Sequence, residues 1–282
     1  MRQFILPKDP APDGTVVLCG GDYRYLSGVL RLSPDDPVEG RLPDGSLRSF
    51  RVASLDRRAR TITLRPADER AGTGGVAPLV AVPPGFPFMV LFQWRLKGPK
   101  MDLVIRQATE AGVAAIVPVS GERCVALSAG DARGGRLERI VREARQQSGS
   151  PVATELLDTV PSSGVGAVWS ELRARAGSFA QADDVTGSRS DRPAADRALV
   201  FTEAPLARKT LHRYLESGAR SVALAVGPEG GMTDGEIDGL VAAGFECVHF
   251  ATNVLRAETC ALYAIAAVQN ALMEIESWRS KE

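Results

Sequence analysis

Three polar side chains stand at the start of a long predicted helix, directly after an apolar strand. Arg256, Glu258 and Thr259 supply a cation, a carboxylate and a hydroxyl at the beginning of a helix expected over Ala257–Ile275. A carboxylate there interacts favourably with the positive end of the helix dipole. A plain helix cap with a local Arg256–Glu258 pair is the alternative, and an exposed pair adds little stability. The convergence of the three groups favours a ligand site.

A glycine-rich loop, Gly227-Pro228-Glu229-Gly230-Gly231, is the second chemical feature, and it follows the apolar run Val222–Val226. The loop lacks the Gly-Lys-Ser/Thr ending of a Walker loop and the spacing of a dinucleotide-binding motif, so both of those interpretations lose support. Its glycines would let a ligand contact the backbone closely. An ordinary turn between a strand and a helix is the alternative.

The elements around these residues follow a strand–helix rhythm. Thr233 and Glu236 have the spacing of a capping box, which predicts a helix start just after the glycine loop. A further strand over about Cys247–Phe250 leads into the segment Ala251–Arg256. Ligands of α/β sheets bind outside the carboxyl ends of the strands. We therefore expect the two loops to contribute to one site.

Two domains are expected in the 282-residue chain. Residues 1–75 carry short alternating segments typical of a small β-barrel, and residues 66–87, rich in Ala, Gly and Pro, are a plausible linker. Residues 76–282 alternate strands and helices, which indicates a mostly parallel sheet flanked by helices. Residues 177–197 are polar and are predicted to form a long surface loop. The expected strands of the first domain are Thr15–Cys19, Val38–Leu42, Ser49–Leu55 and Thr61–Leu64; the second domain is expected to add strands Phe88–Trp94, Ala115–Val119 and Ala198–Phe201 and helices Met101–Ala111 and Gly135–Gln147.

Charge and composition limit the classes of ligand and the cellular location that the sequence allows. Lys plus Arg and Asp plus Glu number 34 each, so polyanion binding must come from local clusters of charge. The four cysteines and two histidines lack the spacing of metal ligands, and no metal is expected. No signal peptide precedes the fold and no apolar run reaches 18 residues, so we expect a cytoplasmic protein without membrane contact.

The motifs together resemble a known family. Residues 226–237 (VGPEGGMTDGEI) followed by residues 253–262 (NVLRAETCAL) are similar to the paired signature of SPOUT-superfamily RNA methyltransferases, and the match is best to the bacterial family that methylates uridine N3 in 16S ribosomal RNA. The resemblance covers nearly the whole chain. It is also carried by residues 96–101, 107–113, 116–118, 122–123 and 143–149, and by residues 1–4 and 25–31 of a PUA-like RNA-binding barrel.

This resemblance implies a deep trefoil knot near the C-terminus, S-adenosyl-L-methionine bound in the knot, and a homodimer with the site at its interface. It places the cofactor on three loops, each following a strand. The residues implied in cofactor binding are Thr202, Glu203, Ala204, Gly227, Glu229, Gly230, Phe250, Asn253, Val254, Leu255, Arg256 and Thr259. The implied partner is 16S ribosomal RNA or the assembled small ribosomal subunit.

The chain departs from the family pattern in places. Ala251-Thr252-Asn253 replaces a glycine-containing turn, which could reshape the adenosine pocket, and Ala257 stands where the family has Thr. Ser150 replaces an Arg, and Arg24-Tyr25 replaces a His pair; both changes bear on RNA contact.

Methylation of uridine N3 requires loss of a weakly acidic proton, after which a nearby cation can stabilise the anion. Arg256 is the expected catalytic residue for that role or for orienting the base. Glu258 is expected to position Arg256 or to accept the proton, with structural capping as the alternative.

Expected RNA contacts come from cations on both domains. They are Arg2, Arg24, Arg31, Lys97, Lys100 and Arg123. The arginines at 133, 136, 139, 142 and 145 fit either phosphate contact or a solvated, self-paired helix face. Two other functions remain open: ribose 2′-O-methylation by a related knotted enzyme, and a non-catalytic RNA-binding factor in ribosome assembly.

Overall fold

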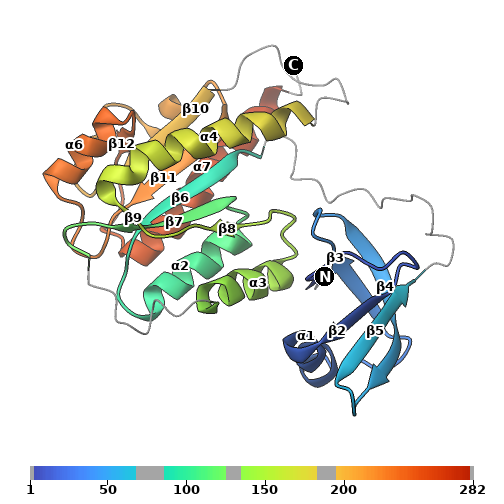
Figure 1. Cartoon of the computed structure of the whole chain (residues 1–282). Helices are drawn as coiled ribbons and strands as arrows, with labels where there is room; N and C mark the ends of the chain where they lie inside the picture. The colour runs from blue at the N-terminus through green and yellow to red at the C-terminus, as the bar shows by residue number, and fades with distance from the viewer. Residues whose placement is uncertain (1–2, 68–85, 125–134, 183–194, 280–282) are drawn as a thin grey trace. The chain divides into compact units, whose positions relative to one another are not determined.

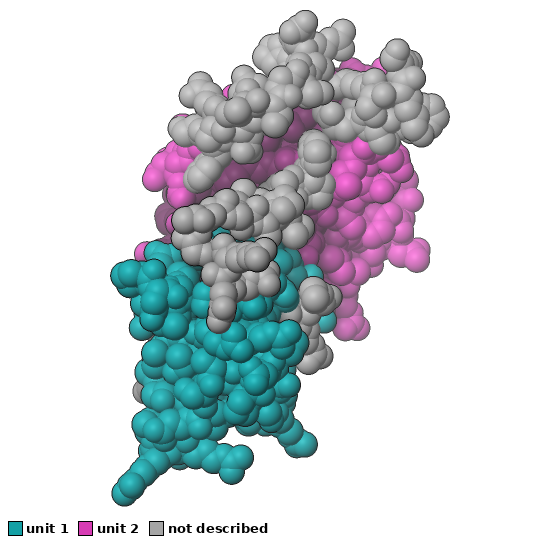
Figure 2. Space-filling model, turned by 90° about the vertical axis from the view of Figure 1, so that its right-hand side faces the viewer, with its two compact units in different colours: residues 1–82, 146–151 teal, residues 83–145, 152–282 magenta. Residues whose placement is uncertain are grey.

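The computed structural model of the chain describes residues 3–67, 86–124, 135–182 and 195–279 (Figure 1). Two compact units are present: residues 1–82 with 146–151, and residues 83–145 with 152–282 (Figure 2). The expected domain boundary between residues 75 and 76 and most of the expected linker lie outside the described residues. No helix in the described part of the chain is long and apolar enough to cross a membrane.

The first unit contains a five-stranded sheet. Its strands, in the spatial order β1-β3-β4-β5-β2, are β1 (Phe4–Ile5), β3 (Pro37–Arg41), β4 (Leu47–Asp56), β5 (Thr61–Pro66) and β2 (Val16–Cys19). The four strands expected from alternation are confirmed, and β1 is an addition that pairs parallel to β3. The short helix α1 (Gly20–Arg24) and a π-helical turn over Tyr25–Val29 follow β2. Inward-facing Val52, Ile62 and Leu64 form the core with Leu26 and Phe50.

The second unit is a parallel sheet with helices on both faces, as strand–helix alternation predicts (Figure 1). The strand order is β12-β10-β11-β6-β7-β8, and β9 also pairs with β7. The strands are β6 (Phe88–Trp94), β7 (Ala115–Ser120), β8 (Glu155–Leu156), β9 (Val160–Pro161), β10 (Ala195–Phe201), β11 (Ala219–Val226) and β12 (Glu246–Val248). All the pairings are parallel.

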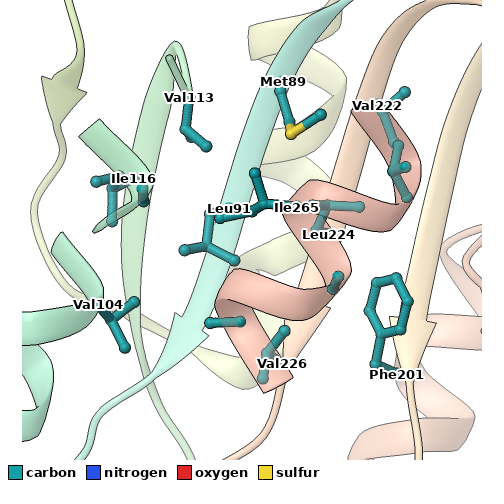
Figure 3. Packing of buried hydrophobic residues seen from close by; sticks show 14 of the residues in the cluster. Met89, Leu91, Val104, Val113, Ile116, Phe201, Val222, Leu224, Val226 and Ile265 are labelled. Carbon is teal, nitrogen blue, oxygen red and sulfur yellow. The ribbon is translucent and has the colours of Figure 1, made fainter. Parts of the chain in front are cut away.

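Side-chain alternation divides the core into two layers. On one face Leu91 and Leu224 pack with Val104 of α2 and Ile265 of α7 (Figure 3). On the other face Phe92 and its neighbours pack against α4 and α6. The helices are α2 (Pro99–Glu110), α3 (Arg136–Ser148), α4 (Val165–Ala182), α5 (Leu211–Leu215), α6 (Asp234–Ala242) and α7 (Ala257–Arg279). The central strands are buried on both sides, which explains their continuous apolar runs.

One prediction about this unit is wrong in part. Residues 177–182 do not begin a loop but form the end of α4, and residues 195–197 already belong to β10. The helix has a reason to form, because Val165, Trp169 and Leu172 recur at helical spacing and are buried against the sheet. Residues 183–194 of the expected loop lie outside the described residues.

Candidate active site

Four neighbouring strands end at the same level and bring their following loops together. Phe201 of β10 is in register with Val226 of β11 and with Val248 of β12, and Val226 is in register with Gln93 of β6. Because the strands are parallel, the segments that follow them leave the sheet at one edge. The three expected cofactor loops, residues 202–204, 227–231 and 250–256, therefore belong to one edge.

The loop after β10 is closed by local hydrogen bonds. The Thr202 backbone N–H donates to the Val248 carbonyl at 3.0 Å, and its hydroxyl donates to the Ala204 carbonyl at 2.9 Å. Glu203 and Ala204 are exposed at the tip of the turn. The first bond ties the end of β10 to the end of β12, and the second closes the loop on itself.

The glycine loop is held by side chains from two other segments. The buried Gln93 amide donates from Nε2 to the carbonyls of Val226 and Gly227, at 3.2 and 3.4 Å. Arg123 donates from Nη1 to the Gly230 carbonyl at 2.9 Å. Arg123 is a predicted RNA contact, and in the structure its guanidinium supports the glycine loop. Gln93 is a single polar residue within the otherwise apolar strand β6. That isolated polar position is a signal in the sequence, but Gln93 is not among the site residues predicted from it.

The start of α6 fixes the far end of the same loop. The predicted capping box is present: the Thr233 backbone N–H donates to Glu236 Oε2 at 2.9 Å, and the Thr233 hydroxyl accepts from the Glu236 N–H at 3.3 Å. Trp94 Nε1–H donates to Glu236 Oε1 at 2.9 Å. Burial raises the pKa of Glu236, but the hydrogen bonds from Trp94, Thr233 and the Glu122 N–H outweigh burial and leave the pKa below its usual 4.5.

The loop after β12 begins with an aromatic cluster. Phe250 stacks on Phe201 with ring centroids 5.1 Å apart, and it meets Tyr263 of α7 edge to face at 4.8 Å. The chain departs from the family pattern at this point, and the Phe250 ring supplies an apolar wall. Asn253 and Val254 beyond it are exposed.

Arg256 is the residue directly before α7. Within the described segments, its exposed side chain makes no hydrogen bond and no ion pair. The alternative in which Arg256 pairs with Glu258 as part of a helix cap is therefore wrong for this structure. Thr259, in the first turn of α7, is also exposed. The guanidinium is available to a ligand or a substrate.

Glu258 instead pairs with a lysine from a distant segment. Lys100 Nζ lies 3.5 Å from Glu258 Oε2 and 3.2 Å from Glu229 Oε1 in the glycine loop. The Lys97 backbone N–H donates to the same Glu229 oxygen at 3.3 Å. Burial raises the pKa of Glu229, but hydrogen bonds from its own N–H, Lys100 and Lys97, with the Lys100 charge, outweigh burial and lower the pKa below 4.5.

The remaining residues expected to bind RNA come from both units. Lys97 is exposed beside the glycine loop, whereas Arg24 and Arg31 are exposed in the first unit and Arg2 lies outside the described residues. Ser150, which stands where the family has an arginine, is buried, and its carbonyl accepts a hydrogen bond from the Gln3 amide at 3.2 Å. On α3, Arg139 pairs with Glu143, as a self-paired helix face predicts, whereas Arg136 pairs with Asp102 of α2.

Comparison with known proteins identifies the family to which this chain belongs. The model of the RNA methyltransferase domain matches residues 86–269. Ribosomal RNA small subunit methyltransferase E of Synechocystis is 30% identical over 280 residues, which cover 96% of this chain and 78% of that protein. The protein of the same name from Mycobacterium bovis is 30% identical, with 92% of this chain and 88% of that protein covered.

A solved structure agrees with the sequence comparison. The crystal structure of ribosomal RNA small subunit methyltransferase E from Neisseria gonorrhoeae, bound to S-adenosyl methionine, superposes with a TM-score of 0.71 at 25% identity and covers 96% of this chain and 97% of that one. It shares the α/β fold. The chain described here therefore belongs to the RNA methyltransferase family.

Proposed function

We propose that this protein uses S-adenosyl-L-methionine to methylate N3 of a uridine in 16S ribosomal RNA. The observation that carries the proposal is the meeting of three loops at one sheet edge in a chain of the RNA methyltransferase family. The third loop ends at Arg256, whose guanidinium has no partner among the described residues. The relatives are small-subunit ribosomal RNA methyltransferases by name, and their similarity spans most of both chains.

The loops offer what the cofactor needs. Gly227, Gly230 and Gly231 carry no side chains, so an adenosyl or methionyl group can approach the backbone of this loop closely. Phe250 supplies an apolar surface, and the carboxylates of Glu203 and Glu229 can accept hydrogen bonds from ribose hydroxyls or from an ammonium. The cofactor supplies an activated methyl group on a sulfonium. Cofactor binding is assigned to Thr202, Glu203, Ala204, Gly227, Glu229, Gly230, Phe250, Asn253, Val254, Leu255, Arg256 and Thr259.

Arg256 is the proposed catalytic cation. Uridine N3 becomes a good nucleophile only when its proton leaves, and negative charge then spreads onto the flanking carbonyl oxygens. A guanidinium without a carboxylate partner keeps its full charge for those oxygens. Its planar donors can also orient the base for in-line transfer.

Glu258 has a different environment from the one the sequence suggested. Its carboxylate faces Lys100, so it does not orient Arg256 through an ion pair. Its Oε2 atom is buried and accepts no hydrogen bond from any described residue. We assign Glu258 the role of proton acceptor or of structural anchor for α7. Kinetic measurements on a Glu258 variant distinguish the two roles, because loss of a proton acceptor lowers kcat and leaves cofactor affinity unchanged.

A homodimer with a trefoil knot is part of the proposal. Apolar side chains remain exposed next to the site, including Val254 at 75% exposure, with Leu262, Tyr263 and Met273 along α7. An apolar stripe on the helix that follows the cofactor loops fits an interface with a second copy. The knot rests on the family resemblance.

RNA binding is assigned to cations of both units. Arg24 and Arg31 are exposed in the first unit, which we propose acts as a PUA-like RNA-binding domain, and Lys97 is exposed beside the glycine loop. Phosphate contacts of this kind fix position and affinity rather than sequence. The substrate is 16S ribosomal RNA or the assembled small subunit, and the protein acts in the cytoplasm.

Calorimetry and a methyl-transfer assay test the proposal. The protein should bind S-adenosyl-L-methionine and transfer labelled methyl groups to small subunits that lack the modification, with free 16S ribosomal RNA as the parallel substrate. Failure to bind the cofactor would favour a non-catalytic assembly factor. Transfer to ribose hydroxyls alone would identify the activity as 2′-O-methylation.

A further inference from the structure

Lys100 connects the glycine loop to the first turn of α7. One nitrogen, Lys100 Nζ, lies within 3.5 Å of a carboxylate oxygen from the glycine loop and of another from the first turn of α7. Lys100 itself is near the start of α2, on a third segment. The Lys97 N–H adds a hydrogen bond to Glu229 from the same turn. Three distant segments therefore meet at one ammonium group.

The charges of this cluster argue against an RNA-binding role for Lys100. The ammonium faces two carboxylates, Glu229 and Glu258, so the three groups together carry a net negative charge. A phosphate brought to Lys100 would approach both carboxylates as well. Affinity for RNA comes from cations that are free to neutralise phosphates. Lys97 is such a cation, because no ion pair to its exposed ammonium is present in the described part of the chain.

The burial of Glu258 shows why the charge of Lys100 matters. The Glu258 side chain is only 11% exposed, and its Oε2 accepts no hydrogen bond from a described residue. A buried carboxylate that loses its counter-charge is costly, and it moves or takes up a proton. The first turn of α7 would move with it, because the Cys260 N–H donates to the Arg256 carbonyl at 2.8 Å within that turn.

We propose that Lys100 is a positioning residue that holds the glycine loop and the first turn of α7 in the arrangement that binds the cofactor. It acts through Glu229 and Glu258 and does not contact RNA phosphate. The inference rests on the proposed function of the same site. It predicts that the charge of Lys100 serves cofactor affinity and the placement of Arg256.

The test compares Lys100→Met with Lys100→Arg, and with Lys97→Met as the matched control. Calorimetry measures S-adenosyl-L-methionine affinity, filter binding without cofactor measures RNA affinity, and thermal unfolding checks the fold. Lys100→Met should weaken cofactor binding by at least about tenfold, with near-native RNA affinity, and Lys100→Arg should restore most of the loss. Lys97→Met should do the opposite: it should lower RNA affinity and leave cofactor affinity unchanged.

A double-mutant cycle with Glu258→Gln provides the second measurement. If Lys100 acts through Glu258, the effect of Lys100→Met on cofactor affinity should shrink in the Glu258→Gln background, because the two residues are coupled. Additive losses overturn the inference. If Lys100→Met does not fold, Lys100→Gln, which also removes the charge but keeps a polar side chain, takes its place in the native and Glu258→Gln backgrounds.

The failures of the two proposals are distinguishable. A native protein that binds no S-adenosyl-L-methionine contradicts the proposed function itself. A native protein that binds and methylates, while Lys100→Met retains cofactor affinity and loses RNA affinity, leaves the function standing and makes Lys100 an RNA contact.

Discussion

The indole N–H of Trp94 donates a 2.9 Å hydrogen bond to Oε1 of Glu236 and so joins the end of β6 to the first turn of α6. Both residues are buried. The same carboxylate completes the capping box with Thr233. The glycine loop lies between β11 and α6. Because this bond holds the start of α6 against β6, it fixes the position at which the loop ends.

Glu236→Gln should destabilise the fold by about 1–3 kcal/mol. The carboxylate accepts from the N–H groups of Trp94 and Glu122 with Oε1 and from the Thr233 N–H with Oε2. The side-chain amide of glutamine has one oxygen that accepts, and its nitrogen cannot accept. The folded-state pKa of Glu236 is lowered, so its stabilisation is present above pH 4.5 and is lost as the pH falls through the folded-state value. Urea unfolding at neutral and acidic pH measures both effects. The variant should show a weaker loss of stability below pH 4.5 than the native protein, and an equal acid loss would refute the assignment.

Gly121→Ala should lower stability by about 1–3 kcal/mol through overpacking. A Cβ at Gly121 would stand 2.2 Å from Glu236 Oε1 and 2.4 Å from Trp94 Nε1, inside the hydrogen-bonded pair. Gly239→Ala in α6 is the matched control, since a Cβ there meets nothing within 4 Å and alanine favours a helix. Thermal unfolding should show a lower midpoint for the first variant only; equal midpoints would contradict the packing.

Arg256→Ala should reduce kcat by about 10²-fold or more while leaving the fold intact. The side chain is exposed and makes no bond to the described residues, so no structural support is lost. Steady-state methyl transfer and thermal unfolding measure the two effects. Arg106→Ala, an exposed arginine on α2, is the control. Native turnover in Arg256→Ala would remove this residue from the mechanism.

Phe250→Ala should weaken S-adenosyl-L-methionine binding, because the ring packs against Phe201 and Tyr263 and shapes the loop after β12. Each ring pair contributes roughly 0.5–1.5 kcal/mol, so a loss of about tenfold in affinity is expected. Calorimetry measures it, with Leu103→Ala on the exposed side of α2 as control. Unchanged affinity would show that this loop shapes no cofactor pocket.

Cys260 should resist thiol reagents in the folded protein. Burial raises its pKa to about 11, so almost no thiolate is present at pH 8. Cys19 is exposed and should react first. Labelling with a thiol reagent at pH 8, followed by peptide mass spectrometry, checks the order. Cys19→Ser should remove the fast phase, and fast modification of Cys260 would mean that the start of α7 opens.

Local patterns predicted much of this structure. The apolar run Phe88–Trp94 forms β6 with the expected bounds, and the capping box at Thr233 begins α6 as expected. The helix expected from Ala257 begins there. In each case the signal lies within a few consecutive residues, where hydrophobic period or capping chemistry decides the conformation.

The parts that were missed depend on contacts between distant segments. Lys100 meets Glu229 and Glu258 only because α2, the glycine loop and α7 converge at one sheet edge, and no spacing in the chain encodes that convergence. The polar composition of the end of α4 predicts a loop, but the segment is helical. The buried Trp169 and Leu172 anchor the preceding turns, and the helix continues from them.

Nucleoside mass spectrometry tests the central claim most directly. Small ribosomal subunits that lack the modification are incubated with the protein and S-adenosyl-L-methionine labelled in the methyl group, and the 16S ribosomal RNA is digested to nucleosides. The account predicts labelled 3-methyluridine with the native protein and a large loss of it with Arg256→Ala. Label found only in 2′-O-methylated nucleosides, or no labelled nucleoside at all, would contradict the account.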